Sequence, residues 1–120
     1  MSGQRAQLLL HFREMSLPNP PKVLVLQGEI DLHVSSNVGA SLAKIIDQQP
    51  SRQIVNLREV SYIDSSGLAA LITAAKNVED YGGRLMLTGV AENVRTILEN
   101  AHLIEFFSVF PHVDAALAAT

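Results

Sequence analysis

Two neighbouring serines at the start of a predicted helix are the residues of this 120-residue chain that most directly suggest chemistry. Ser65 and Ser66 follow a short apolar strand and Asp64, and they precede Gly67 and an apolar run with helical spacing. The first backbone N–H groups of a helix have no partner inside it, and the helix dipole attracts negative charge to this end. A hydroxyl placed there could cap the helix, act as a nucleophile, or accept a phosphate.

A nucleophilic serine needs a base within hydrogen-bonding reach and a tight, strained turn that exposes its hydroxyl. The sequence around Ser65 reads Ile-Asp-Ser-Ser-Gly, so the small residue that such a turn requires before the serine is missing. Of the four histidines, only His33, two residues after Asp31, is predicted to lie near the same edge of the fold. Because a lone serine and histidine specify a catalytic triad weakly, we expect no catalytic residues and a protein that is not an enzyme.

The same region offers little to a metal ion or a cofactor. Glu29, Asp31 and Asp64 could converge on a cation, but no His-x-x-x-His pair or calcium-loop pattern supports them. The glycine pair at residues 82–83 follows a predicted helix, which indicates helix termination and not a phosphate-binding loop. The sequence therefore predicts neither a metal site nor a cofactor.

Capping of the helix is the purely structural explanation for the polar run. Asp and Ser are favoured at the N-cap, but one residue suffices for that role. Asp64, Ser65 and Ser66 together leave at least one hydroxyl without an assigned function.

The composition indicates one compact soluble domain that spans residues 1–120. Hydrophobic residues make up 48% of the chain and charged residues 18%, and the formal net charge is −3, which argues against a nucleic-acid partner. No run of 18 apolar residues and no signal peptide is recognisable, so no membrane association is expected. Cysteine is absent, which excludes disulfides and thiolate metal sites and makes a cytoplasmic location the default.

Strands alternate with helices along most of the chain, which predicts right-handed crossovers and a mostly parallel sheet. The expected fold is α/β, with about five strands, of which the first is antiparallel, and about four helices. The predicted strands are 7–13, 22–27, 53–57, 85–88 and 103–107, and the predicted helices are 35–48, 65–81, 91–101 and 113–119.

Three details of this prediction concern the site and the core. Residues 23–26 are apolar in succession, as expected for a strand buried on both faces, and Gly28 is expected to end that strand. Residues 28–31 and 58–66 both follow strands, so they should lie at the same edge of the sheet. The three phenylalanines near the C-terminus (Phe106, Phe107 and Phe110) are expected in the core.

Residues 54–71 closely resemble the signature of the STAS domain, which bacterial anti-sigma factor antagonists share with the cytoplasmic tails of sulfate transporters. The family core, a hydrophobic residue followed by Asp-Ser-Ser-Gly-Leu, is matched by residues 63–68. Residues 28–32 (Gly-Glu-Ile-Asp-Leu) resemble the family loop Gly-Glu-Leu-Asp-Leu, and residues 82–85 resemble its Gly-Gly-x-Leu. Residues 94–107 resemble its closing helix and strand, so the matches follow the family's order and spacing.

The chain departs from the family pattern at three places. Val34 and Ser35 stand where Thr-Ala is common, and residues 100–102 replace a usual Thr-Gly or Ser-Gly. Both lie at predicted helix boundaries, where they should alter caps more than function. Asn56 stands where Asp is frequent, which removes a negative charge and bears on the identity of the partner.

The resemblance implies phosphorylation-controlled partner switching. The unmodified protein would bind an anti-sigma factor that is also an ATP-dependent serine kinase, and so free a sigma factor. Phosphorylation of Ser65 would break the complex, and a serine phosphatase would restore it. The resemblance implies a partner-binding surface made of Gly28, Glu29, Asp31, Asp64, Ser66 and Gly67. Other members imply an alternative, a non-switching interaction subunit of a lipid-transport complex or a stress-signalling scaffold.

Overall fold

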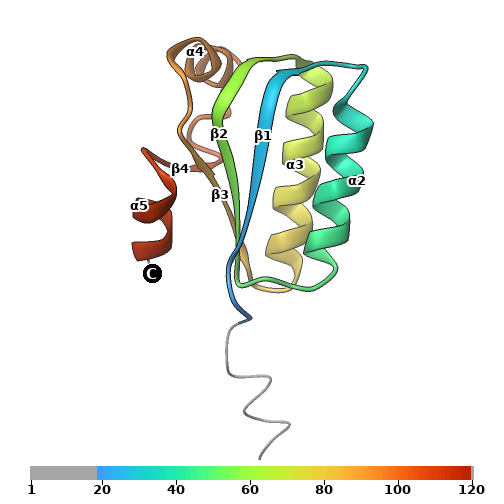
Figure 1. Ribbon diagram of the computed structural model, residues 1–120, viewed down its shortest axis with the longest axis vertical. Helices are drawn as coiled ribbons and strands as arrows, with labels where there is room; N and C mark the ends of the chain where they lie inside the picture. Colours follow the sequence, from blue (N-terminus) through green and yellow to red (C-terminus); the bar gives the residue numbers. More distant parts are fainter. Residues whose placement is uncertain (1–18, 120) are drawn as a thin grey trace, which may run out of the picture.

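Four strands lie side by side in the order β1-β2-β3-β4, all of them parallel, in the computed structural model of the chain, which describes residues 19–119 (Figure 1). The strands are β1 (Lys22–Ile30), β2 (Arg52–Ile63), β3 (Arg84–Thr88) and β4 (Ser108–Phe110). The helices are α2 (Ser35–Ile46), α3 (Ser65–Asp80), α4 (Glu92–Asn100) and α5 (Val113–Ala118).

This sheet corrects the prediction made from the sequence. The expectation of about five strands with an antiparallel first strand was wrong, since the described residues form four strands, all parallel. The predicted strand at residues 7–13 lies outside the described residues. The α/β class and the four helices agree with the prediction.

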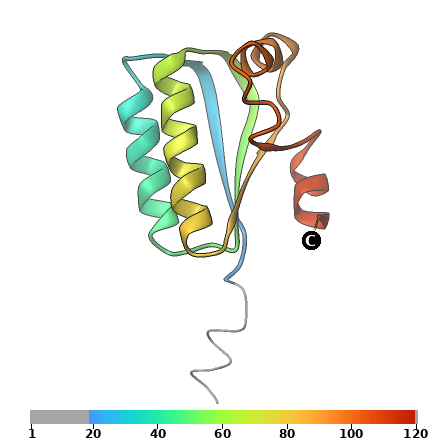
Figure 2. The same ribbon diagram turned by 180° about the vertical axis from the view of Figure 1, so that it is seen from behind.

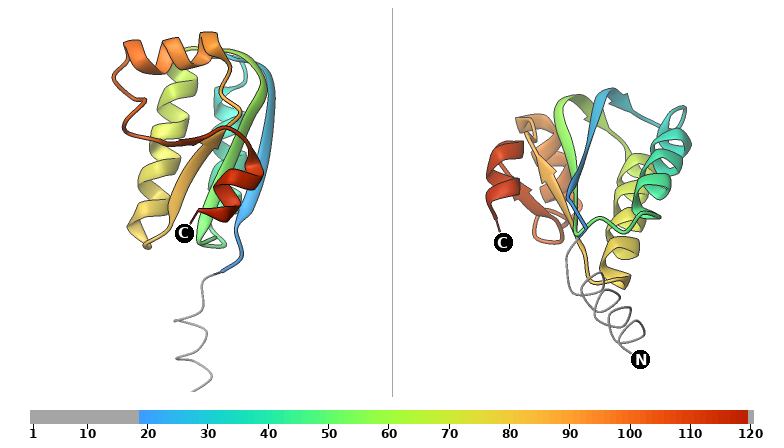
Figure 3. Two further views of the ribbon diagram at one scale, coloured as in Figure 1. Left: turned by 90° about the vertical axis from the view of Figure 1, so that its left-hand side faces the viewer. Right: turned by 60° about the horizontal axis from the view of Figure 1, so that its bottom comes forward.

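The helices form layers on the two faces of the sheet. Helices α2 and α3 lie side by side over one face, and α5 lies on the opposite side (Figures 1 and 2). Helix α4 crosses the end of the sheet at which the strands finish (Figure 3). Because α3 begins directly after β2 ends, the start of α3 also lies at this carboxyl edge of the sheet. The other connections from a strand to a helix lie at the same edge.

Two apolar clusters fill the space between these layers. The larger one lies beneath α2, α3 and α4 and contains Val55 and Leu87, while the smaller one contains Ile54, Met86 and Ala116 of α5. Successive residues of a strand point to opposite faces, so β2 is buried on both of its faces.

Strand β1 differs from β2, because only one of its faces is covered. Leu26 and Ile30 are buried against the helices, whereas Val23 and Val25 are exposed. The prediction that residues 23–26 are buried on both faces was wrong, because α5 packs over the other strands, β2, β3 and β4. An apolar run alone does not reveal whether a helix covers the second face.

Both strands that lead to the site are longer than predicted. Gly28 has φ of +79°, and the pairing of β1 with β2 shifts register beside it, but β1 continues to Ile30. Glycine tolerates such a local irregularity, so it interrupts the ladder and does not end the strand. Strand β2 continues to Ile63, directly before the polar run that begins at Asp64.

The last strand lies later in the chain than predicted. Residues 103–107 form turns, and the strand follows at Ser108. The apolar residues of these turns enter the core without strand pairing, since Phe107 is buried and its ring meets that of Phe106 edge to face at 5.0 Å. Phe106 itself is exposed and Phe110 is partly buried, so only Phe107 is a fully buried core residue.

A single arginine fixes the C-terminal helix to the sheet. The Arg52 Nη1 group donates to the carbonyl oxygens of Ala116, Leu117 and Ala119 at 3.3, 2.8 and 2.6 Å. A cation at a helix C-terminus is favourable because the last carbonyls have no partner inside the helix. Because Arg52 is the first residue of β2, the end of α5 lies at the amino edge of the sheet.

Candidate functional site

The start of α3 is capped by the carboxylate of Asp64. This residue has an extended backbone, and its Oδ1 atom accepts the backbone N–H groups of Ser66 at 2.9 Å and Gly67 at 3.1 Å. The same Oδ1 atom accepts the Ser66 hydroxyl at 2.5 Å. Asp64 is therefore the N-cap, and Ser66 supports it.

The two serines have different surroundings. Ser66 is partly buried and its hydroxyl is held by Asp64, whereas Ser65 is exposed. Within residues 19–119, the Ser65 hydroxyl makes no hydrogen bond. Of the two hydroxyls at the helix start, that of Ser65 is the one available to an incoming group.

The hydrogen bonds to Asp64 keep its side chain ionised. The Ser66 hydroxyl contributes most to lowering the pKa of Asp64, followed by the backbone N–H of Gly67, against an opposing effect of desolvation. The backbone N–H groups of Ser66 and Leu32 lower this pKa further. Any charge added to Ser65 at neutral pH therefore lies beside a carboxylate that is already negative.

The loop after β1 lies against this helix start. The backbone N–H of Asp64 donates to the Ile30 carbonyl at 3.1 Å, and Ile30 pairs with Ile63 in the sheet. The structure thus brings together the two segments, residues 28–31 and 58–66, that the sequence predicted to be neighbours.

Asp31 organises its own loop. Its Oδ1 atom accepts the backbone N–H of His33 at 3.0 Å, and its carbonyl accepts those of Val34 and Ser35. Asp31 is partly buried, so part of its side chain remains accessible. The carboxylate shapes the turn that leads into α2 and also lies on the edge that contains Ser65.

The two glycines of the predicted site lie in contrasting places. Gly67 is buried, and a Cβ atom there would lie 2.7 Å from Ile63 Cγ1 and 2.8 Å from the Ile30 carbonyl oxygen. It therefore allows α3 to pack closely on the strand ends, and Gly67 itself lies beneath the surface. Gly28 is exposed on β1, and so is the next residue, Glu29, which pairs with Tyr62.

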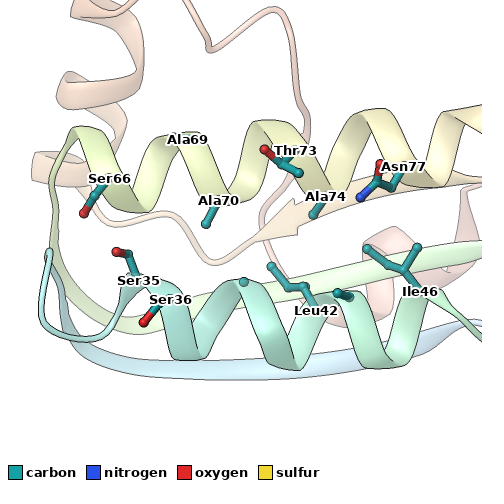
Figure 4. Close-up of a pocket in the computed structure, with 12 residues that line it drawn as sticks. Ser35, Ser36, Leu42, Ile46, Ser66, Ala69, Ala70, Thr73, Ala74 and Asn77 are labelled. Carbon is teal, nitrogen blue, oxygen red and sulfur yellow. The ribbon is translucent and has the colours of Figure 1, made fainter.

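A groove of about 370 Å³ runs between α2 and α3 and begins beside Ser66 (Figure 4). Ser35, Ser36 and Ser66 lie at one end of it. None of the residues that line it is charged, and small residues such as Gly39 and Ala70 keep the helices close. Sequence reasoning did not find this groove, although glycine and alanine at helical spacing on both helices were the available signal.

Glu29, Asp31 and Asp64 do not gather into one group around a common point. No group of three His, Cys, Asp or Glu residues in the described part of the chain could hold a metal ion. Among the same residues, no helix is long and apolar enough to cross a membrane.

Comparisons with known proteins place this geometry in a family. Residues 14–116 match the STAS domain. BtrV of Bordetella bronchiseptica, which has a provisional assignment as an anti-sigma factor antagonist, is 29% identical over 97 residues, which are 81% of this chain and 84% of BtrV. An anti-sigma F factor antagonist from Paenibacillus polymyxa is 26% identical over 96 residues, or 79% of this chain and 82% of the relative. The crystal structure of a sulfate transporter family protein from Wolinella succinogenes is similar with a TM-score of 0.73 and 28% identity over 85% of each chain.

Proposed function

The chain belongs to the STAS domain family, as its motifs predicted, and we propose that it is an anti-sigma factor antagonist controlled by phosphorylation of Ser65. In its unmodified form it binds an anti-sigma factor that is also a serine kinase, and so frees a sigma factor. Phosphorylation ends this binding, and a serine phosphatase reverses the modification. The protein is a regulatory binding partner and not an enzyme.

The different bonding of two adjacent hydroxyls is the observation that carries this proposal. A kinase needs an accessible hydroxyl, and Ser65 is exposed while Ser66 is engaged by Asp64. The helix is already capped by Asp64, so Ser65 is not needed to close the helix start. This difference between the two hydroxyls supports Ser65 as the residue that is phosphorylated.

The names of two relatives support the same function. Both BtrV and the protein from Paenibacillus polymyxa are described as anti-sigma factor antagonists, and each aligns over about four fifths of its length. The similarity therefore extends over most of the length of each relative and is not confined to a short motif.

Electrostatics explains how one phosphate could switch binding. A phosphoserine adds roughly −1.5 to −2 charges, which a helix start accepts, so the fold need not change. A partner that packs on a neutral hydroxyl would instead have to bury this charge beside the ionised Asp64. A hundredfold loss of affinity requires only about 2.7 kcal/mol, which one uncompensated charge at a buried contact can supply.

The test combines the protein with the kinase-type anti-sigma factors of the same organism and ATP. Intact mass and peptide mapping should find one phosphate on Ser65, and none on Ser65→Ala. Ser66→Ala is the matched control, because it removes the neighbouring hydroxyl and leaves Ser65 in place. Modification at another residue would contradict the proposed site. Stable binding to a transporter ATPase, unaffected by ATP, would instead favour the non-switching subunit of a lipid-transport complex.

A further inference from the structure

Two large apolar side chains are exposed close to Ser65. Leu32, in the loop after β1, is 74% exposed, the highest value of any large hydrophobic residue in the described part of the chain. Tyr62, near the end of β2, is 45% exposed. Single exposed apolar residues are common on protein surfaces, but two of them beside one candidate site require an explanation.

Chain geometry shows that both residues fit under one docked protein. Ile30 of β1 pairs with Ile63 of β2. Leu32 lies two residues after Ile30, and Tyr62 lies directly before Ile63. Given about 3.8 Å between consecutive Cα atoms and about 4.8 Å between strands, the Cα atoms of Leu32 and Tyr62 are at most roughly 17 Å apart. A standard interface covers about 800 Å² per partner, a patch roughly 30 Å across. Ser65, two residues after Ile63, falls within the same patch.

Leu32 is held in place although its side chain is exposed. The neighbouring Asp31 side chain closes the turn by accepting the N–H of His33, and the Asp31 carbonyl accepts the N–H groups of Val34 and Ser35. A residue on such a fixed loop loses little conformational freedom when it is buried by a partner. Tyr62 is fixed by its place in β2, opposite Glu29.

Three carboxylates belong to residues beside Leu32 and Tyr62. Glu29 pairs with Tyr62, Asp31 precedes Leu32, and Asp64 directly follows Ile63, the neighbour of Tyr62. An interface of this kind, with apolar residues inside an acidic border, is complementary to an apolar pocket bordered by Lys and Arg.

We propose that Leu32 and Tyr62 are the apolar anchors through which this edge docks on the anti-sigma factor, whose facing surface has an apolar pocket with a basic border. The proposal rests on the function proposed above and identifies the contacts that the Ser65 phosphate would disrupt. A partner that covers both anchors would also cover the start of α3, so a phosphate added to Ser65 would lose its solvation in the complex.

Single substitutions of the anchors test the proposal. Affinity for the anti-sigma factor that phosphorylates the wild-type protein is measured for Leu32→Ser, Tyr62→Ser and the control Leu117→Ser. Leu117 is 38% exposed on α5, on the other side of the sheet, so its substitution removes a similar side chain away from Ser65. Each anchor variant should bind at least tenfold more weakly, and the control should remain within twofold of wild type. Unchanged melting temperatures would show that all three variants fold.

The contribution of the acidic border to binding is tested by a separate measurement, the rate of association. Because the border attracts a basic partner, Glu29→Gln should slow association at low salt and reduce the dependence of the association rate on ionic strength. Glu79→Gln, near the far end of α3, should leave both unchanged. If wild type binds and both anchor variants bind equally well, the anchors are refuted while the proposed function stands. If wild type binds no kinase-type anti-sigma factor of its organism, both proposals fail.

Discussion

The Asp64 carboxylate accepts the Ser66 hydroxyl at 2.5 Å, and this single contact distinguishes the two serines of the site. It places Ser66 in the support of the helix cap and leaves the exposed Ser65 outside it. The N-cap and the exposed hydroxyl thus belong to adjacent residues, Asp64 and Ser65, that have different surroundings. The predictions below separate their effects on stability from their effects on binding.

Ser65→Asp should weaken binding to the anti-sigma factor about a hundredfold without weakening the fold. A negative charge in the first turn of α3 is favoured by the helix dipole by about 0.3–1 kcal/mol, so the free energy of unfolding should stay equal or rise. Affinity for the anti-sigma factor should fall by about a hundredfold, equivalent to about 2.7 kcal/mol. Calorimetric titration and urea denaturation of the same sample measure both quantities. Unfolding of the variant, or full binding by it, would contradict the switch.

Asp64→Asn should lower the melting temperature by on the order of 5 °C at neutral pH, because the cap loses its charge-assisted hydrogen bonds. The pKa of Asp64 is lowered in the folded state, so the carboxylate stabilises the fold above its unfolded pKa of about 3.9. This stabilisation is lost as the pH falls through the lower, folded pKa. The difference between wild type and variant should therefore shrink below about pH 4. Melting curves between pH 7 and pH 2.5 check this, and a constant difference would show that the carboxylate charge is not involved.

Gly67→Ala should destabilise the protein by about 1–3 kcal/mol, because the new methyl group would overlap Ile63 and the Ile30 carbonyl. Gly39→Ala is the matched control in α2. Its methyl group would meet only Ala70 Cβ, at 4.0 Å, and alanine favours a helix over glycine by roughly 0.5–1 kcal/mol. Urea denaturation should give opposite signs for the two variants. Equal changes in the free energy of unfolding would show that the close packing at the start of α3 does not contribute to stability.

Tyr81→Phe tests the opposite end of α3. The Tyr81 hydroxyl donates to the Pro50 carbonyl at 2.6 Å, and its loss should cost about 1 kcal/mol. Burial raises the pKa of Tyr81, so the neutral phenol stabilises the fold below its unfolded pKa of about 10. This contribution is lost as the pH rises through the higher, folded pKa. Denaturation at pH 7 and above pH 10 should show the wild-type advantage fading, and Ser65 phosphorylation should be unaffected.

The start of the helix that carries Ser65 could be predicted from the sequence because its determinants are local. A polar run followed by an apolar stretch with helical spacing fixes the helix start within a few residues, and α3 begins at Ser65. The end of the preceding strand could not be placed in the same way, since β2 runs six residues beyond its predicted end at residue 57. The roles of Asp64 and Ser66 could not be assigned in advance, since Asp and Ser are both good caps and only side-chain geometry distinguishes them. Gly67 matched the family motif, but its burial beneath the surface depends on how α3 packs on Ile30.

The errors concern features that depend on the tertiary structure. Residues 23–26 are as apolar as a fully buried strand, but α5 leaves Val23 and Val25 exposed. The apolar residues at 103–107 pack against the core although they lie in turns and not in a strand. Their apolar composition therefore led to a predicted strand that ends before β4 begins. Leu32 was noted only as part of a motif, because the sequence gives no measure of how far a loop side chain projects into solvent.

The bond from Arg52 to the last carbonyls of α5 has a practical consequence for experiments on the switch. It holds the C-terminal end of the described chain beside the amino end of β2, and Asn19 precedes β1 at that same edge (Figure 1). Ser65 lies at the opposite edge. A fluorophore attached at Asn19 or Ala119 would therefore leave the face with Ser65 unobstructed, and the protein could be immobilised at these positions for kinetic measurements.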